Sequence, residues 1–257
     1  KNTASDDLFI IGEMGFGLAI NFLLTWRLWN EQAPKSAQLH FISTELYPLK
    51  KEDLSIILNQ FTELSLYSTQ LIKKYSLLTP GYHRFNFGNV SLTLLLGDAE
   101  TELRELICDP DRDLQQKLRT FVVDCWFFDG FSPQKNKALW CDELLEVICF
   151  LSDNNTTLTS YSVAKYFKDA LDNNGFRYLK KKCIGNKREF LWAGNLTIKD
   201  NLFRQKIRQA TSPWHCRNFQ KKVTKDQTIS IIGAGLAGCL LANSLAKRGF
   251  LVTLYES

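Results

Sequence analysis

The stretch Leu8–Phe22, LFIIGEMGFGLAINF, constrains the fold more than any other part of the chain. It begins with four apolar residues, which predict a buried parallel strand, and it continues through a turn that contains Gly15 and Gly17. Apolar residues then recur at near-helical spacing as far as Trp29. A strand, a glycine turn and a helix in this order open a nucleotide-binding α/β unit, in which the glycines let a ligand approach the main chain.

Glu13 narrows the kind of ligand that this first loop accepts. The N-terminus of a helix is an anion site, so a carboxylate beside it disfavours a pyrophosphate. A cationic or hydroxyl-rich ligand tolerates the same carboxylate, which points to a sulfonium cofactor such as S-adenosylmethionine. The alternative is a plain glycine turn with a glutamate on its surface.

The composition excludes several other classes of protein. The 257 residues, 45% of them hydrophobic, suffice for one core and part of a second. The seven cysteines are scattered without a CxxC pair and the three histidines do not cluster, which predicts reduced thiols, a cytoplasmic location and no metal site. No apolar run approaches the roughly 20 residues that cross a bilayer, so no membrane partner is expected. The net charge of +5 is mild and by itself suggests little about a partner. The sequence does not fix the oligomeric state, and a monomer is favoured.

Strand-like and helix-like segments alternate through the first 194 residues. After the opening strand, strands are predicted at 39–45, 90–96, 121–128 and 156–161, and helices at 51–75, 100–107, 138–151 and 164–173. Residues 78–84 are predicted to be a turn-rich connection, and residues 176–183 and 188–193 an edge hairpin. This alternation predicts an α/β fold with a doubly wound parallel sheet.

The composition changes sharply after residue 194. Residues 195–226 carry eight lysines and arginines against two acids, which indicates a basic linker. Residues 227–257 then open a second strand–glycine–helix unit and reach a second strand at 251–255. A lone βαβ unit of roughly 30 residues cannot bury its own faces. The predicted parts are therefore a first domain at 1–194, the linker at 195–226 and the start of an incomplete second domain at 227–257.

Four acids follow strands of the first predicted sheet: Glu13, Glu45, Asp98 and Asp129. Ligands of open parallel sheets bind at the carboxyl ends of the strands, and several acids at one edge are costly unless they bind positive charge or hydrogen-bond donors. We assign Glu45 to the hydroxyls of a ribose, Asp98 to an adenine amino group and Asp129 to the transferring group. Taken singly, each acid is better explained as a solvated loop carboxylate, and it is the joint placement of the four that favours a ligand site.

Asp129 begins the segment DGFSP, in which an acid and a proline flank an aromatic residue. A nitrogen nucleophile must be unprotonated and aimed at the methyl carbon, and a carboxylate can orient it and accept its developing charge. The neighbouring aromatics Phe128, Phe131 and Trp140 suit stacking on a base, although core packing is the commoner role. Asp124, at the start of the same strand, is expected to be structural.

Basic residues gather on the predicted hairpin and continue into the linker; they are Arg177, Lys180, Lys181, Lys182, Lys187 and Arg188. Phosphate backbones attract such stretches, so nucleic acid is a candidate partner. A solvated hairpin face is the alternative.

The second glycine loop has the complete spacing GxGxxG, formed by Gly233, Gly235 and Gly238. It follows a β-branched strand, and Glu256 lies about 20 residues beyond it, as a dinucleotide site requires for the ribose. No acid precedes Gly233, so a pyrophosphate is tolerated. The alternative is a plain turn between a strand and a helix.

Several segments in order resemble one protein family: EMGFGLAINF, HFISTELYPL, PGYHR, LLLGDAE, DCWFFDGFSPQKNKALW, LTSYSVAKYFKDALDNNGF and GNKREFLWAG. They are similar to the methyltransferase domain of the bifunctional tRNA 5-methylaminomethyl-2-thiouridine biosynthesis proteins. SPWH and the segment from Ile229 to Ser257 resemble the family's linker and the start of its FAD-dependent oxidoreductase domain. The resemblance implies a Rossmann-like class I methyltransferase sheet followed by a truncated FAD-binding βαβ unit, in a chain cut at both ends.

The resemblance also implies two reactions on the wobble uridine of certain tRNAs. The FAD domain removes a carboxymethyl group from 5-carboxymethylaminomethyluridine, and the methyltransferase domain then methylates the exposed amino nitrogen with S-adenosylmethionine. The matching cofactor residues are Glu13, Gly15, Gly17, Asn21, Glu45 and Asp98 for S-adenosylmethionine, and Gly233, Gly235, Gly238 and Glu256 for FAD. Asp129 matches the acid beside the transferring methyl group.

One departure from the family pattern bears on the cofactor loop. Ala19 replaces the last glycine of the usual GFGTG, and its methyl group would crowd the cofactor if the backbone there has a positive φ. Two other hypotheses are kept open. One is a flavin-dependent oxidoreductase with a non-catalytic or tRNA-binding N-terminal domain, and the other is a tRNA-binding protein whose cofactor loop Ala19 blocks.

Overall fold

The computed structural model describes residues 8–75, 79–106, 122–129, 137–182, 189–194, 228–246 and 250–256. The chain divides into two compact units, residues 1–216 and 217–257. The predicted linker at 195–226 lies outside the described residues, and so do Phe131, Lys187 and Arg188.

An eight-stranded sheet organises the first unit. Its strands are β1 (Leu8–Met14), β2 (Gln38–Glu45), β3 (Gly81–Phe87), β4 (Val90–Leu96), β5 (Cys125–Phe128), β6 (Thr157–Ser160), β7 (Arg177–Lys182) and β8 (Glu189–Gly194). They lie in the order β3-β4-β2-β1-β5-β6-β8-β7. The central strands β4, β2, β1, β5 and β6 are mutually parallel, and both edges are antiparallel.

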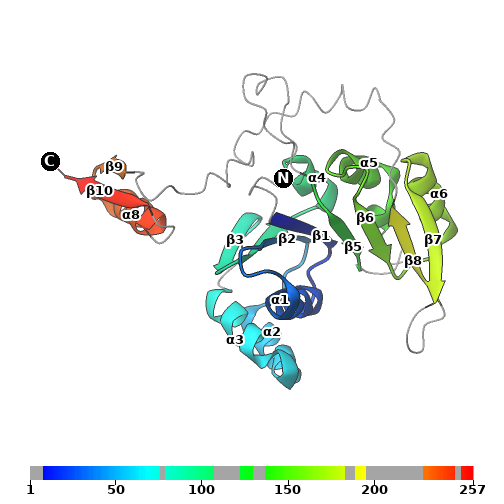
Figure 1. Cartoon of the computed structure of the whole chain (residues 1–257), viewed down its shortest axis with the longest axis horizontal. Helices are drawn as coiled ribbons and strands as arrows, with labels where there is room; N and C mark the ends of the chain where they lie inside the picture. The colour runs from blue at the N-terminus through cyan, green and yellow to red at the C-terminus, as the bar shows by residue number, and fades with distance from the viewer. Residues whose placement is uncertain are drawn as a thin grey trace. The chain divides into compact units, whose positions relative to one another are not determined.

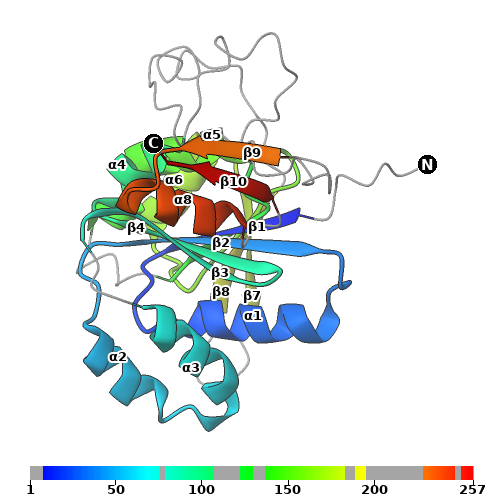
Figure 2. The same cartoon turned by 90° about the vertical axis from the view of Figure 1, so that its left-hand side faces the viewer.

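Helices cover both faces of this sheet (Figures 1 and 2). On one face lie α1 (Ile20–Gln32), α2 (Lys51–Leu58) and α3 (Ser65–Lys74), and on the other lie α4 (Ala99–Arg104), α5 (Asp142–Phe150) and α6 (Lys165–Asn173). Two short 3-10 helices, η1 (Thr62–Leu64) and η2 (Lys137–Trp140), precede α3 and α5. The predicted α/β, doubly wound architecture is therefore confirmed.

Two local predictions were wrong. The connection predicted at 78–84 is largely strand, since β3 pairs antiparallel with β4 from Gly81 opposite Leu96 to Phe87 opposite Val90. The Thr-Pro-Gly sequence that suggested a turn lies just before and at the start of this strand, and the buried alternation shows only at Phe85 and Phe87. The single helix predicted at 51–75 is divided by η1 into α2 and α3.

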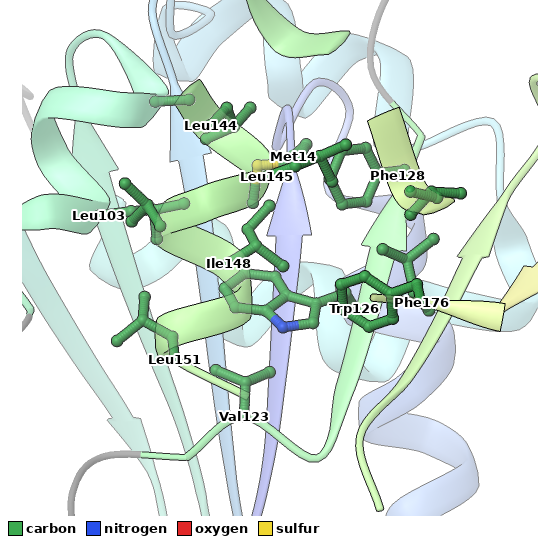
Figure 3. Packing of buried hydrophobic residues seen from close by; sticks show 14 of the residues in the cluster. Met14, Leu103, Val123, Trp126, Phe128, Leu144, Leu145, Ile148, Leu151 and Phe176 are labelled. Atoms are coloured by element: carbon green, nitrogen blue, oxygen red, sulfur yellow. The ribbon is translucent and has the colours of Figure 1, made fainter. Parts of the chain in front are cut away.

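Two hydrophobic clusters fill the space between the sheet and its helices. The cluster under α1 is rich in aromatic rings: the Trp26 and Phe87 centroids lie 4.4 Å apart, and Phe22 meets Phe41 edge-on at 5.4 Å. The cluster under α4, α5 and α6 is centred on Trp126, whose ring lies among Val123, Ile148, Leu151 and Phe176 (Figure 3). Burial of these large side chains fixes the central strands that carry the site.

Gly12 makes room for the Trp126 ring. The two residues are directly paired between β1 and β5, and a Cβ atom built on Gly12 would lie 2.1 Å from the ring. Trp126 is fully buried, and its indole N–H donates to the Ser152 hydroxyl at 2.9 Å, so the ring has little freedom to move. A glycine within a strand often marks such a close approach.

We therefore expect Gly12→Ala to destabilise the first unit by about 2 kcal/mol, the usual cost of overpacking a well-packed core. Urea unfolding measures the change. Gly97→Ala is the matched control, because its Cβ would meet only the end of the flexible Glu102 side chain. Equal stabilities of the two variants would contradict the effect expected from close packing.

The second unit is small. It consists of β9 (Thr228–Ile232), α8 (Leu236–Ala246) and β10 (Leu251–Tyr255), and its two strands are parallel. This agrees with the predicted strand–helix–strand order. No residue of α8 is buried, and Leu236 is 81% exposed, as expected of a βαβ unit too short to bury its own faces.

Candidate functional site

Glu13 lies near the carboxyl end of β1 and is 1% exposed. Both of its carboxyl oxygens accept hydrogen bonds: the Ser43 hydroxyl donates to Oε2 at 2.7 Å, and the Asn21 amide donates to Oε1 at 2.9 Å. Ser43 is the residue paired with Glu13 on β2, and Asn21 is the second residue of α1. The strand, its neighbour and the helix thus fix one carboxyl group between them.

Asn21 also joins Glu13 to Asp129. Its amide nitrogen donates to Asp129 Oδ2 at 2.9 Å, while Asp129 itself is exposed at the carboxyl end of β5. Because β1 and β5 are parallel neighbours, two acids that are far apart in sequence meet at one edge of the sheet. The buried acid and the exposed acid are bridged by one amide group.

Glu45 ends β2 and holds the glycine loop. The Gly17 N–H donates to Glu45 Oε2 and the Tyr47 N–H donates to Oε1, each at 2.9 Å. A carboxylate offers about four acceptor positions, so hydroxyl groups of a ligand can still bind there.

Asp98 follows β4 and caps α4. Its Oδ1 accepts from the Thr101 N–H at 3.1 Å and from the Thr101 hydroxyl at 3.2 Å, which is the geometry of a helix N-cap. The adjacent Gly97 N–H donates to the Glu45 carbonyl at 3.1 Å, which places Asp98 at the same sheet edge. Asp98 therefore has a structural role as a helix cap, and its contact with an adenine amino group stays a prediction.

Burial changes the charge expected of Glu13. Desolvation raises the pKa of Glu13 to about 8, against the hydrogen bonds from Ser43 and Asn21, and the charges of Asp129 and Glu45 raise it further. Burial therefore favours the protonated form of Glu13 at neutral pH. From the sequence, Glu13 was expected to be a carboxylate, whereas its burial in the folded protein favours the protonated form.

The glycine loop leaves space above its backbone. Gly15 and Gly17 have φ values of 89° and 51°, and a Cβ built on exposed Gly17 would meet nothing within 4 Å. Ala19 has the positive φ that was anticipated, 62°, but it is fully buried in the cluster beneath α1. Its methyl group therefore points into the core and does not crowd the open side of the loop.

We expect Ala19→Gly to leave both stability and cofactor affinity nearly unchanged. Relief of the left-handed backbone contributes about 1 kcal/mol, and loss of a buried methyl group together with the greater freedom of unfolded glycine offsets it. Urea unfolding and titration with S-adenosylmethionine test both statements. Gly17→Ala, which adds a methyl group on the open side, is the contrasting variant and should weaken binding. A gain of affinity in Ala19→Gly would show instead that Ala19 blocks the loop.

The second glycine loop has the geometry of a close strand–helix contact. Gly233 has a φ of 99°, and a Cβ on Gly238 would lie 1.8 Å from the Gly233 carbonyl oxygen. A Cβ on Gly235 would meet nothing within 4 Å, so the loop is open to a ligand. Glu256, just after β10, accepts a hydrogen bond from the Ala234 N–H, which places the predicted ribose acid beside the loop.

Sequence reasoning missed Ser43 and Tyr161. Tyr161 follows β6 at the same sheet edge. Burial is the main cause that raises the pKa of Tyr161, and the charge of Asp129 raises it further. The strand-end rule that selected the acids would also have selected Tyr161, but it was applied to acids alone. Phe128 and Trp140 are buried in the hydrophobic core, which is the commoner role for such aromatic side chains and leaves neither ring exposed for stacking on a base. Asp124 accepts the Ile10 N–H at 2.7 Å, the structural role expected of it.

No group of three or more His, Cys, Asp or Glu side chains that could hold a metal ion is found among the described residues. Within the same residues, no helix is long and apolar enough to cross a membrane.

Comparison with known families shows to which family the chain belongs. Residues 62–195 match the family model described as S-adenosyl-L-methionine-dependent methyltransferase. The chain belongs to this methyltransferase family. Residues 231–257 of the methyltransferase match a second family model, the NAD(P)-binding Rossmann-like domain.

Curated relatives cover nearly the whole methyltransferase chain. The tRNA 5-methylaminomethyl-2-thiouridine biosynthesis bifunctional protein MnmC of Legionella pneumophila (strain Corby) is 45% identical over 99% of the chain. The protein of the same name from Ectopseudomonas mendocina is 38% identical over 96%. The chain spans only 38% and 34% of their respective lengths. These matches confirm the family resemblance seen in the sequence.

A solved structure supports the fold of the methyltransferase. The crystal structure of MNMC2 from Aquifex aeolicus superposes with a TM-score of 0.52 at 23% identity, covering 81% of this chain and 61% of that one.

The residues at the sheet edge fit S-adenosylmethionine as the methyltransferase's cofactor. Glu13, Glu45 and Asp129 place three carboxyl groups around Asn21 and the glycine loop. The Gly17 backbone is open to the approach of a ligand. Such a set suits a cation that also carries ribose hydroxyls.

Proposed function

We propose that this methyltransferase methylates the amino nitrogen of 5-aminomethyl-(2-thio)uridine at the wobble position of tRNA, with S-adenosylmethionine as the donor. The observation that carries the proposal is the Asn21 bridge, which fixes a buried acid and an exposed acid side by side at the ligand edge. The relatives named as tRNA 5-methylaminomethyl-2-thiouridine biosynthesis proteins supply the substrate class.

The proposed roles follow from where each side chain lies. Glu13, Gly15, Gly17, Asn21, Glu45 and Asp98 would hold the cofactor, which when bound supplies an electrophilic methyl group on a sulfonium. Asp129 is exposed and already oriented by Asn21, so it is the group available to an entering amine. Its carboxylate accepts an N–H of that amine, directs the lone pair and takes up the released proton.

The second unit supports a further part of the proposal. We assign its loop, with Gly233, Gly235, Gly238 and Glu256, to FAD in the complete protein, because the open loop and adjacent acid suit a dinucleotide. That domain would remove the carboxymethyl group from 5-carboxymethylaminomethyluridine and so prepare the amine. The matching parts are a methyltransferase domain at 1–194, a basic linker at 195–226 and the start of the FAD domain at 227–257, in a cytoplasmic protein that acts on tRNA.

Transfer of a labelled methyl group tests the proposed function. The 257-residue protein is incubated with methyl-labelled S-adenosylmethionine and tRNA that carries 5-aminomethyl-2-thiouridine, and the nucleosides are then separated. Label in 5-methylaminomethyl-2-thiouridine is the expected result, and tRNA with an unmodified uridine at that position is the control. Binding of the cofactor without transfer to any tRNA would overturn the proposal.

A further inference from the structure

One face of the sheet continues from the candidate site to the basic edge strand. The cross-strand pairs form a row from Glu13 through Phe127, Thr159 and Trp192 to Leu179. Directly paired residues point to the same face of a sheet. The side chains of Trp192 and Leu179 therefore lie on the same face as Glu13, the face that carries α1.

The hairpin also reaches the same edge of the sheet as Asp129. A second row of pairs joins Phe128, Ser160, Leu191 and Lys180. Asp129 and Lys181 each come one residue beyond this row, in strands that run in the same direction. With neighbouring strands about 4.8 Å apart, three spacings place Lys181 about 14 Å from Asp129 along the sheet.

This part of the face lies outside both hydrophobic clusters. The clustered residues of β6, β7 and β8 all lie on the opposite face; they are Leu158, Leu191, Ala193 and Tyr178. Leu179 is 59% exposed, and Trp192 is half-buried. A Cβ on Gly194 would lie 2.9 Å from the Trp192 ring, so glycine there lets the ring lie close to the strand.

The positive charges of β7 are divided between the two faces. Lys181 and Arg177 share the face of Trp192, and the Lys181 ammonium lies 4.6 Å from the centroid of its ring. Lys180 points to the opposite face and pairs with Glu189 at 3.2 Å. Among the described residues of β6, β7 and β8, no acid lies on the Trp192 face.

We propose that the hairpin face formed by Arg177, Leu179, Lys181 and Trp192 binds RNA next to the nucleotide held at Asp129. This inference rests on the proposed function, because it assigns a surface to the tRNA partner of the same site. Arg177 and Lys181 share their face with no acid of the described parts of β6, β7 and β8, and cations placed in this way suit phosphates. A partly exposed indole beside them suits stacking with a base. Since the rows of paired residues join this face to the sheet edge that carries Asp129, an RNA strand bound there would run toward Asp129.

Two lysines that are adjacent in sequence provide a matched test. Binding of the 257-residue protein to unmodified tRNA is measured at several salt concentrations for Lys181→Ala and Lys180→Ala. We expect Lys181→Ala to weaken binding roughly fivefold and to reduce the slope of log affinity against log salt by just under 1, as loss of one phosphate contact does. Lys180→Ala should change affinity less than about twofold, because Glu189 already pairs with Lys180.

The aromatic ring is tested separately. Trp192→Ala should weaken binding about tenfold, the loss expected for one base–aromatic stack, while Trp192→Phe should retain most of the affinity. Circular dichroism establishes that the variants are folded, and the lysine pair decides the question if Trp192→Ala does not fold.

Equal effects of the two lysine variants would overturn the proposal, because they would show a general charge effect in place of a specific surface. Unchanged binding in Lys181→Ala, as when another part of the chain or a protein covers this face, would overturn it as well. The labelled methyl assay, run on the wild-type protein and on the Lys181→Ala and Trp192→Ala variants, separates the two proposals. Methyl transfer that is insensitive to Lys181 and Trp192 contradicts the surface alone, whereas absence of transfer contradicts the proposed function.

Discussion

Replacement of Asp129 by asparagine is expected to lower the turnover number for methyl transfer about 10²–10⁴-fold, the range for loss of a positioned proton acceptor. Asparagine preserves the size of the side chain and an oxygen that can accept from Asn21. It removes the charge that directs the amine and takes its proton. Single-turnover kinetics with labelled S-adenosylmethionine measure the change, and titration should show cofactor affinity within about threefold of the wild type.

Asp98→Asn is the matched control for this prediction, since Asp98 is an exposed acid at the same edge that caps α4. It should raise the KM for S-adenosylmethionine more than it lowers kcat, because its proposed contact is with the cofactor in both ground and transition states. If Asp129→Asn changed only cofactor affinity, Asp129 would belong to the cofactor site and not to the acceptor site.

Glu13 should make the stability of the first unit decrease as pH rises from about 4.5 to about 8. The folded state raises the pKa of Glu13 from 4.5 to about 8, chiefly through burial, so in this range the folded state binds more protons than the unfolded state. The stabilisation is complete below pH 4.5 and is lost as the pH passes the folded pKa. The loss is on the order of 4 kcal/mol, since each tenfold change in proton affinity corresponds to about 1.4 kcal/mol.

The difference in unfolding free energy between the wild type and Glu13→Gln isolates this contribution. Glutamine keeps the shape and can still bond to Ser43 and Asn21, but it does not titrate. Urea unfolding at intervals between pH 5 and pH 8 should show the wild type losing stability relative to the variant. If the difference in unfolding free energy between the two proteins stayed constant from pH 5 to pH 8, Glu13 would be ionised over that whole range, contrary to the expected effect of burial.

The architecture was largely predictable because its signals are local. Apolar runs such as Leu8–Ile11 and Val90–Leu96, each closed by a glycine or an acid, mark buried parallel strands whatever packs on them. The strand β3 was missed because its edge position leaves only Phe85 and Phe87 buried, and two residues give too short an alternation to recognise. Edge strands depend on pairing with a neighbour, which local sequence does not show.

The sequence predicted which residues lie at the candidate site, but it did not predict their hydrogen bonds or their burial. The rule that ligands bind at strand ends selected Glu13, Glu45, Asp98 and Asp129, but the bridge through Asn21 depends on how α1 crosses the sheet. Burial of Glu13 and of the Ala19 methyl group depends on residues from other elements. The assembled fold therefore determines the protonation of Glu13 and the exposure of the Ala19 methyl group, and both differ from what the sequence predicted.

The buried position of Glu13 bears on how the proposed site would distinguish S-adenosylmethionine from the demethylated product. Burial raises the pKa of the Glu13 carboxyl group to about 8, and a cation bound beside it would lower that pKa. Under the proposed function, Glu13 would lie near a sulfonium before transfer and near an uncharged thioether afterwards, which would no longer lower its pKa. Glu13 would then recover a proton from solvent, which favours departure of the product and couples each exchange of cofactor to the pH of the surroundings.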